Sequence, residues 1–264
     1  MDPRDPAVPE LLAHGRIEVT GRLVDASNAT LFGTISTDAL AAQCVYKPVK
    51  GERPLWDFPD GTLAGREVAA FLVSEAAGFH VVPPTVLRDG PFGSGMVQVW
   101  VDTDDEREFV DVCSPREAPA GWIAVLRARG EGGEPAVLVH ADTPALQRMA
   151  AFDVVVNNAD RKGGHVLAGT DGHLYGVDHG LTLHVEDKLR TVLWGWVGQE
   201  LPAEVVVACE KLRAELDGSL ADILGEHITR REVRALSARV DALLAEPTFP
   251  EPGGFGPAIP WPAF

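Results

Sequence analysis

The chain changes its pattern along its length, from short strand-like segments to longer helical ones. Residues 16–25 alternate apolar and polar side chains, and residues 31–36 and 41–48 read as further strands after short turns. Residues 81–102 hold two more strand-like segments around a turn rich in Gly and Pro. Strands gathered in one part of a chain and helices in the other are typical of the α+β class.

Helix boundaries are marked by capping residues. Thr62 precedes the one helical segment of the strand-rich part, and Gly78 is its expected end. Thr143 followed by a proline predicts the start of a helix that runs to about residue 156. Residues 202–227 predict one or two further helices. Thr229 and Glu232 have the spacing of a capping box and predict the last helix.

This order predicts two lobes and a tail. A chain of 264 residues is long enough for two small lobes. We expect a strand-rich N-terminal lobe with one helix over residues 1–101, and a mainly helical C-terminal lobe over residues 102–246. Residues 102–134, polar and rich in Gly, predict loops at the lobe connection. Residues 247–264 are too rich in Pro and Gly for regular structure. A cleft between lobes is where a small molecule is expected.

Charge and composition exclude several classes of partner. The net charge of −16 opposes electrostatic binding of nucleic acid or of an anionic membrane. The three cysteines are far apart and form neither a disulfide framework nor a metal-binding spacing. No apolar run approaches the ~18 residues of a membrane span, and the first residues lack the pattern of a secretion signal. We therefore expect a cytoplasmic protein.

Four charged residues stand at positions suited to phosphoryl transfer. Lys47 ends an apolar strand, and Glu67 lies on the helix that follows. Asp160 follows an apolar helix, and Asp178 follows a short strand. Taken alone, each is compatible with an ordinary surface or turn residue. Their order matches the parts that the reaction needs: a lysine for phosphates, an acid to hold it, an aspartate to orient the acceptor and a carboxylate for a metal ion.

Three segments resemble the phosphatidylinositol 3-/4-kinase superfamily, a branch of the protein-kinase-like fold. VYKP (residues 45–48) resembles its lysine strand, NNADRKGGH (residues 157–165) its catalytic loop and LYGVDHG (residues 174–180) its metal-binding segment. The likeness spans about residues 16–201 and is nearest to the type II phosphatidylinositol 4-kinases and the HipA-like kinases. The chain also resembles a small actinobacterial family of this type, for which the resemblance implies no particular substrate.

The resemblance implies a two-lobed kinase fold that binds ATP with Mg²⁺ or Mn²⁺. Lys47 would bind the α- and β-phosphates, and Glu67 would hold the lysine. Asp160 would be the catalytic base, Arg161 beside it would supply positive charge for phosphate, and Asp178 would be the principal metal ligand. Residues of one turn would cover the phosphates, although the turn is not glycine-rich: Ser27, Asn28 and Thr30. Backbone groups of a hinge would meet the adenine: Gln98, Val99 and Trp100.

His165 departs from the family pattern. It stands five positions after Asp160, where the family usually has a metal-binding asparagine. Imidazole binds Mn²⁺ better than it matches Mg²⁺, which prefers oxygen. A protonated His165 could instead contact a phosphate, and a loop histidine without a catalytic part is also compatible with the sequence.

The leading hypothesis is an ATP-dependent kinase whose acceptor is a protein or a small metabolite rather than a lipid. Two alternatives keep nucleotide binding: transfer of AMP on the same fold, and a pseudokinase that acts as a regulatory scaffold. The departure at His165 favours the pseudokinase, and the retained Lys47 and Asp178 argue against it. A fourth reading is a metal-dependent hydrolase built on Asp160, His165, Asp178 and His179.

Overall fold

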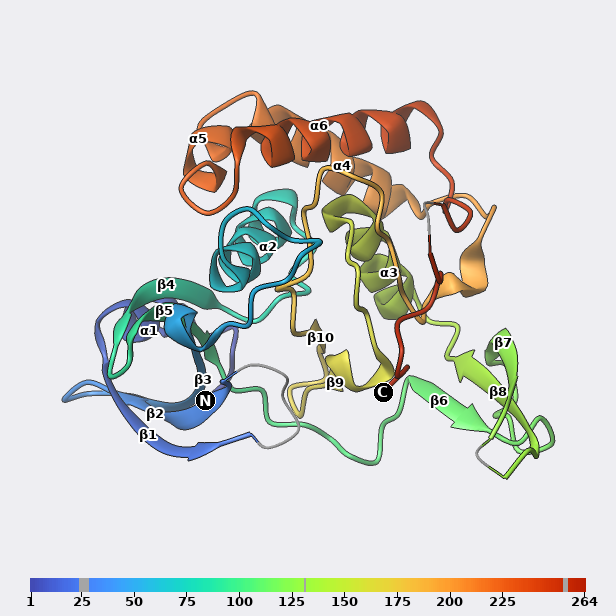
Figure 1. Cartoon of the computed structure of the whole chain (residues 1–264), viewed down its shortest axis with the longest axis horizontal. Helices are drawn as coiled ribbons and strands as arrows, with labels where there is room; N and C mark the ends of the chain where they lie inside the picture. Colours follow the sequence, from blue (N-terminus) through green and yellow to red (C-terminus); the bar gives the residue numbers. More distant parts are fainter. Residues whose placement is uncertain (24–28, 131, 254–255) are drawn as a thin grey trace.

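The computed structural model describes residues 1–23, 29–130, 132–253 and 256–264, and its N-terminal part is built on one antiparallel sheet. The sheet has five strands in the order β1-β2-β3-β5-β4 (Figure 1). The strands are β1 (Arg16–Arg22), β2 (Leu31–Ser36), β3 (Ala41–Pro48), β4 (Thr85–Gly90) and β5 (Gly93–Val99). Two helices pack on the sheet, α1 (Val8–His14) and α2 (Leu63–Ala77).

Alternation along β3 decides which face of the sheet carries Lys47. Cys44 and Tyr46 are buried in a cluster with apolar residues of α1. Lys47, one position on, points to the other face because successive side chains of a strand alternate. Its partner in the sheet register is Met96, which is buried against apolar residues of α2. Lys47 therefore lies on the face of the sheet that α2 covers.

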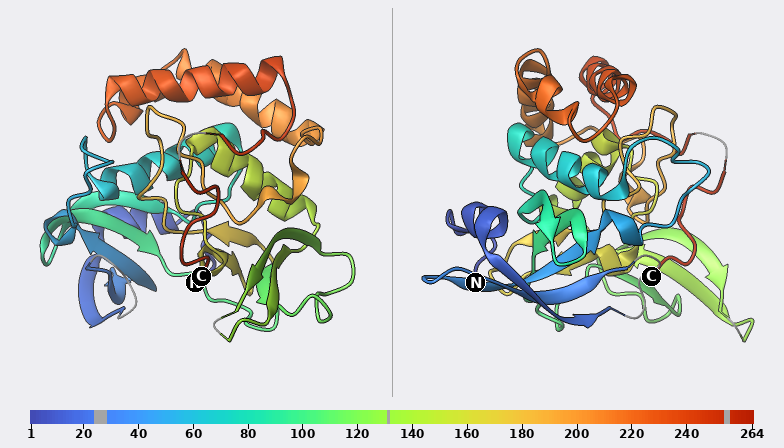
Figure 2. Two further views of the ribbon diagram at one scale, coloured as in Figure 1. Left: turned by 45° about the vertical axis from the view of Figure 1, so that its right-hand side comes forward. Right: turned by 60° about the vertical axis from the view of Figure 1, so that its left-hand side comes forward.

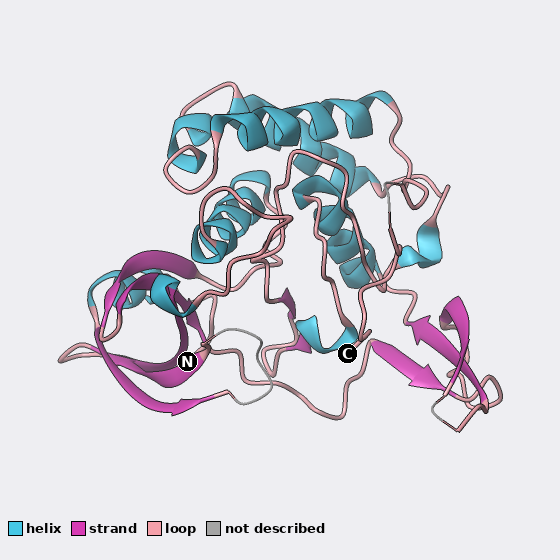
Figure 3. Ribbon diagram, viewed as in Figure 1, coloured by secondary structure: helices cyan, strands magenta, loops and turns pink. Residues whose placement is uncertain are grey.

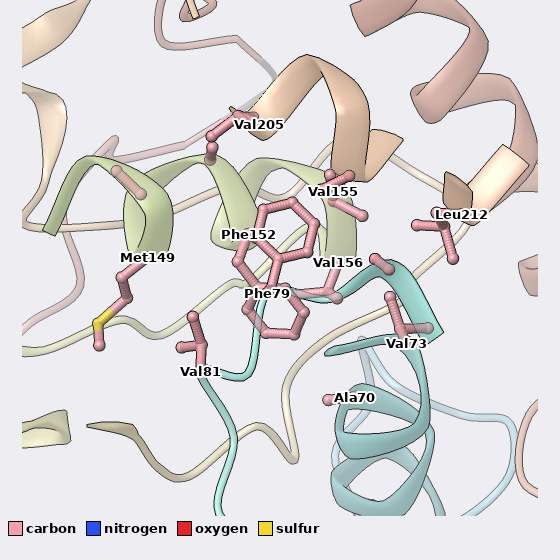
Figure 4. Close-up of a cluster of buried hydrophobic side chains, with 14 of the residues drawn as sticks. Ala70, Val73, Phe79, Val81, Met149, Phe152, Val155, Val156, Val205 and Leu212 are labelled. Atoms are coloured by element: carbon pink, nitrogen blue, oxygen red, sulfur yellow. The ribbon is translucent and has the colours of Figure 1, made fainter. Parts of the chain in front are cut away.

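The C-terminal part is mainly helical. Its helices are α3 (Pro144–Val156), α4 (Ala203–Leu216), α5 (Leu220–Leu224) and α6 (Arg230–Ala245), and Figure 3 shows them gathered above the two short strands β9 (Val166–Ala168) and β10 (Leu174–Gly176). The main apolar core lies between α2, α3 and α4. In Figure 4 the Phe79 ring, just after α2, faces the Phe152 ring of α3, with 5.4 Å between their centroids.

The predicted helix ends are confirmed. Thr62, Thr143 and Thr229 each accept a hydrogen bond from a backbone N–H in the first turn of the helix that they precede. Gly78 ends α2 at a φ of +85°, a conformation that glycine adopts without steric cost. The α+β class is confirmed as well, with the strand-rich part first and the helical part second.

Several elements differ from the expectations. Residues 102–134, predicted as loops, contain β6 (Val110–Cys113) and β7 (Ile123–Arg129), which pair with β8 (Pro135–His140) in a small antiparallel sheet at the right of Figure 1. Most residues of β7 are exposed, so this strand lacks the apolar alternation that signals a buried face. The short helix α1 also differs from the expectations, and three of its seven residues are buried, Val8, Leu11 and Leu12.

The described residues after α6, 246–253 and 256–264, form no helix or strand, as predicted. They run back along the helical part, and residues 256–264 end near β9 and the short 3-10 helix η2 (Gly163–His165), as the two views of Figure 2 show. Two other single-turn 3-10 helices are η1 (Val49–Gly51) and η3 (Trp194–Trp196). Among the described residues, the helices are too short or too polar to cross a bilayer.

Candidate functional site

The ammonium group of Lys47 lies between two carboxylates. Its Nζ is 2.6 Å from Oε1 of Glu67 and 2.7 Å from Oδ1 of Asp178. The other carboxylate oxygen of Glu67 accepts a hydrogen bond from the backbone N–H of His179, at 2.9 Å. Three of the predicted residues, from β3, α2 and the segment after β10, therefore meet at one point.

Local structure explains how each of the three arrives there. Strand alternation directs Lys47 to the α2 face, and Glu67 lies in the first turns of α2, almost fully buried with 2% of its side chain exposed. Asp178 lies two positions after the end of β10, in the left-handed conformation with a φ of +60°. Asp and Asn adopt that conformation more readily than most residues, since their short polar side chains can bond locally.

Burial and neighbouring charges shift the pKa values of Lys47, Glu67 and Asp178. Burial alone would lower the pKa of Lys47, but the Asp178 and Glu67 carboxylates outweigh it and raise that pKa above its usual value. The charge of Lys47 in turn holds the pKa of Asp178 well below its usual range. Burial raises the pKa of Glu67, while the ion pair with Lys47 opposes the change. At neutral pH the site therefore contains an ammonium and an ionised Asp178, whose side chain keeps 49% of its surface exposed.

The same residues line a cavity of about 390 Å³, within the range of small-molecule sites. It is bordered by Thr30, Lys47, Glu52, Arg53, Glu67, Asp160, Lys162, His165 and Asp178, with apolar contacts from residues such as Pro48, Leu55 and Leu181. A larger cavity of about 830 Å³ along α6 has none of the described predicted residues in its lining. Converging charged groups with shifted pKa values favour the smaller cavity as the functional site.

Asp160 is the second carboxylate of the cavity with a strongly shifted pKa. Its side chain is 26% exposed, and burial raises its pKa to about 6, against the opposing charge of Lys162. The Nζ of Lys162 lies 3.7 Å from Oδ2 of Asp160. The backbone N–H of Asp160 donates to Oδ1 of Asn158, at 3.0 Å, which fixes the start of the loop. A carboxyl with a pKa near 6 is well suited to accept a proton at neutral pH.

His165 lies beside Asp178, with 3.5 Å between Nε2 and Oδ2. Burial lowers the pKa of His165 to about 4, so the imidazole is neutral at pH 7. The described residues contain no group of three or more His, Cys, Asp or Glu side chains that could enclose a metal ion. In the cavity lining, Asp178 and His165 are a carboxylate and an imidazole in direct contact with each other.

Arg161 lies elsewhere than expected. Its side chain is fully buried, and Nη2 is 2.9 Å from Oδ1 of Asp153 on α3. Its Nη1 donates to the carbonyl oxygens of His165 and Val177, and Nη2 contacts Nε2 of His179. Because its charge is neutralised inside the helical part, Arg161 does not offer it to a phosphate in the cavity. Its contacts instead join the loop after α3 to α3 itself and to the segment that carries Asp178.

The same cluster argues against the metal-dependent hydrolase. His179 is fully buried, with Nε2 at 2.7 Å from Arg161 Nη2 and its backbone N–H bonded to Glu67. The lining of the cavity contains Asp160, His165 and Asp178 but not His179.

The expected hinge residues do not line the cavity either. The side chain of Gln98 is buried and donates to Thr85 Oγ1, at 2.8 Å. The backbone N–H of Val99 donates to Pro84 O, and that of Trp100 donates to Gln43 O. These donors are already hydrogen-bonded within the sheet and at its edge. The expectation was that backbone groups of these residues meet an adenine. Of the phosphate-covering turn, Thr30 lines the cavity, while Ser27 and Asn28 lie outside the described residues.

Glu52, which lines the cavity, and Arg66, next to Glu67, are charged residues that the sequence did not single out. Glu52, in the loop after β3, accepts hydrogen bonds from the backbone N–H groups of Leu63 and Ala64 and so caps the start of α2. Arg66, next to Glu67, is fully buried and pairs with Glu232 of α6. Nothing in the loop sequence marks Glu52 as a cap, whereas an arginine among the apolar residues of α2 signals a buried ion pair.

The comparisons with known proteins give a similar sequence and similar solved structures. Protein Rv2133c of Mycobacterium tuberculosis is 50% identical over 263 residues, which cover 96% of this chain and 94% of that protein. The crystal structure of the Helicobacter pylori proinflammatory kinase CtkA is similar with a TM-score of 0.42 and 10% identity, over 88% of this chain and 97% of that chain. No family model matches the chain.

Proposed function

The chain belongs to the family of the mycobacterial Protein Rv2133c, and we propose that it is an ATP-dependent phosphotransferase of the phosphatidylinositol 3-/4-kinase-like kind. The observation that carries the proposal is the position of Lys47, bonded to Glu67 and Asp178 at the wall of a cavity that Asp160 also lines. These four residues are the ones that phosphoryl transfer requires, and they come from separate parts of the chain.

Lys47 and Glu67 would form the nucleotide-binding half of the site. The ammonium group, kept charged by its carboxylate neighbours, suits the α- and β-phosphates of ATP. Glu67 is held by the His179 N–H and cannot swing away without losing that bond. Glu67 therefore fixes the direction in which Lys47 points, and an entering phosphate would take the place that Asp178 Oδ1 now occupies beside Nζ.

Asp178, with His165 beside it, would hold Mg²⁺ or Mn²⁺. The donor set fits, because an ionised and half-exposed carboxylate is the oxygen ligand that both ions prefer. When bound, the ion would neutralise charge on the phosphate oxygens. Asp178 would then orient the terminal phosphate toward Asp160, and His165 would flank the second oxygen of Asp178.

Asp160 would act on the acceptor. Its carboxylate would take the proton from the acceptor hydroxyl as the new oxygen–phosphorus bond forms and the bond to ADP breaks. Lys162, 3.7 Å from Asp160, adds positive charge on the same side of the cavity. The acidic chain and its lack of an amphipathic basic helix favour a protein or a small metabolite over a lipid acceptor.

One observation favours a second candidate, a nucleotide-binding pseudokinase. The direct contact of Lys47 with Asp178 leaves the metal-binding carboxylate neutralised by the protein itself, and His165 stands where the family has an oxygen ligand. Transfer of AMP would use the same residues with the nucleotide reversed.

The test is ATP turnover by the purified protein with Mg²⁺ or Mn²⁺, beside the Asp178→Asn variant. A kinase consumes ATP, releases ADP and loses this activity in the variant. A Mn²⁺ preference would assign a ligand role to His165. Label transfer from the α-phosphate would identify AMP transfer. Saturable nucleotide binding without turnover in either metal would identify the pseudokinase, and lack of nucleotide binding would exclude the proposal.

A further inference from the structure

Residues 256–264 lie against the loop that carries Asp160. The backbone N–H of Gly163 donates to the carbonyl oxygen of Ala263, at 2.8 Å. The ring of Phe264 packs directly on Gly163, so closely that a Cβ at this position would overlap it. Gly163 therefore has to be a glycine for the ring to lie where it does.

The contact falls at a sensitive point of the site. Gly163 follows Lys162, which pairs with Asp160, and it begins the single turn η2 that ends at His165. His165 in turn lies beside Asp178. A shift of Gly163 would therefore displace Lys162 and His165, which contact the carboxylates of Asp160 and Asp178.

The segment is itself anchored to the helical part. The carbonyl oxygen of Ala258 accepts hydrogen bonds from the N–H of Thr191, at 3.1 Å, and from Nε1 of Trp194, at 2.8 Å. Ile259 and Ala263 pack against the main apolar core, and Pro260 is buried. These contacts hold the segment at both ends of its path, so Phe264 is not a loose side chain resting on the loop.

Phe264 contributes little to the core. Its surface is 51% exposed although its ring covers Gly163. A side chain that only filled space would be expected deeper in the molecule, because the stabilisation from burial grows with the apolar area that leaves water. The feature of Phe264 that calls for a functional explanation is therefore the contact of its ring with the loop, and not the burial of the ring.

We propose that Ala263 and Phe264 are positioning residues, which hold Gly163 and thereby set the loop from Asp160 to His165 for the transfer reaction. The proposal rests on the proposed function, since it assigns the segment to the same site. Phe264 acts through the loop and need not touch either substrate.

The test compares Phe264→Ala with Phe92→Ala. Phe92 is the matched control, a phenylalanine with 55% exposure in the turn between β4 and β5, distant from the loop in the fold. We expect Phe264→Ala to lower kcat by about tenfold, because small displacements of a catalytic group are costly, with KM for ATP changed less than about twofold. Phe92→Ala should leave both constants unchanged, and both variants should unfold at similar temperatures.

Two further readouts separate positioning from a general loss of stability. Amide hydrogen exchange at Gly163–Val166 should accelerate in Phe264→Ala and not in Phe92→Ala. The acid limb of the pH–rate profile should move below its wild-type position, since a released loop exposes Asp160 to water. Gly163→Ala, which displaces the ring, should reproduce both effects.

The outcomes separate this proposal from the proposed function. Unchanged kcat and unchanged exchange in Phe264→Ala would overturn the positioning role. If the wild-type protein does not turn over ATP, the proposed function fails, and the exchange experiment still decides whether the segment orders the loop. Faster exchange with unchanged kcat would show a structural contact only and would also overturn the proposal.

Discussion

Arg66 and Glu232 form a buried ion pair that joins α2 to the first turn of α6, with 2.5 Å between Nη2 and Oε1. Arg66 also donates to the carbonyl oxygens of Thr182, at 2.8 Å, and Asp60, at 2.9 Å. Glu67, the next residue, faces Lys47. Two adjacent residues of α2 are therefore bonded to Lys47 in the cavity wall and to Glu232 in the helical part. These bonds fix the distance between the cavity and the helical part.

Glu232→Gln should destabilise the fold strongly. The substitution leaves the Arg66 guanidinium buried without its counter-charge, and breaking one side of a buried pair costs about 3 kcal/mol in the free energy of unfolding. Glu204→Gln is the control, because it removes the partly exposed pair with Arg148 and should cost less than about 1 kcal/mol. Urea unfolding of both variants measures the difference, and equal losses would contradict a structural role for the buried pair.

Asp160→Asn should stabilise the fold at neutral pH. The pKa of Asp160 is about 6 in the folded protein and 3.8 as its ordinary value, so the folded state binds the proton more tightly than the unfolded state. Stability contributed by the protonated group is present below pH ~4 and is lost as the pH rises through 6. The neutral amide of the variant removes that loss, so the free energy of unfolding should be higher by about 2 kcal/mol at pH 7. Urea unfolding at pH 7 and pH 4 checks it, and a gain of the same size at both pH values would rule out this origin.

The pH dependence of the reaction rate should also reflect the pKa of Asp160. A catalytic base works when it is deprotonated, so kcat/KM for the acceptor reaction should fall as the pH drops through about 6. An ordinary carboxylate would give its midpoint nearer 4. Initial rates between pH 4.5 and pH 8 in a constant-ionic-strength buffer measure the midpoint, because this range extends about 1.5 units below and about 2 units above the expected value. A flat profile across this range would mean that Asp160 is not the base.

Asp178→Ala and Asp178→Asn should differ in stability while both lose turnover. Asp178 has a φ of +60°, and asparagine tolerates this conformation better than alanine does. The alanine variant should therefore be less stable by about 1 kcal/mol. Thermal unfolding compares the two proteins, and Asn is the better substitution for removing the carboxylate alone. If alanine is equally stable, the backbone strain at residue 178 is negligible.

The helices and strands that carry the site could be predicted from local signals. Thr62, Gly78 and Thr143 lie at helix ends for reasons contained in a few neighbouring residues. The meeting of Lys47 with Asp178 is different, because 131 positions separate them. The order of the residues in the sequence identified Lys47 and Asp178 as candidates. Only the packing of α2 between the sheet and the helical part brings the two within hydrogen-bonding distance.

Arg161 shows what a sequence motif leaves out. Its place beside Asp160 suggested a phosphate contact, yet its partner is Asp153, in the last turns of α3. The informative signal is an aspartate within the apolar run AAFDVVV, since a carboxylate on a buried helix face requires a cation. The strands β6 and β7 had a weaker signal, because β6 has only four residues and most residues of β7 are exposed.

The segment from Asp178 to Leu193 has a consequence for control by covalent modification. Its only hydroxyl-bearing side chains are Thr182 and Thr191, and their exposed fractions are 0% and 3%. Thr182 Oγ1 donates to His179 O, while its own carbonyl accepts from Arg66. A modifying enzyme could reach Thr182 only after this stretch had moved away from Arg66, and Thr191 only after it had moved away from Asp153, whose Oδ2 lies 3.5 Å from Thr191 Oγ1. We therefore expect neither threonine to be phosphorylated in the folded protein.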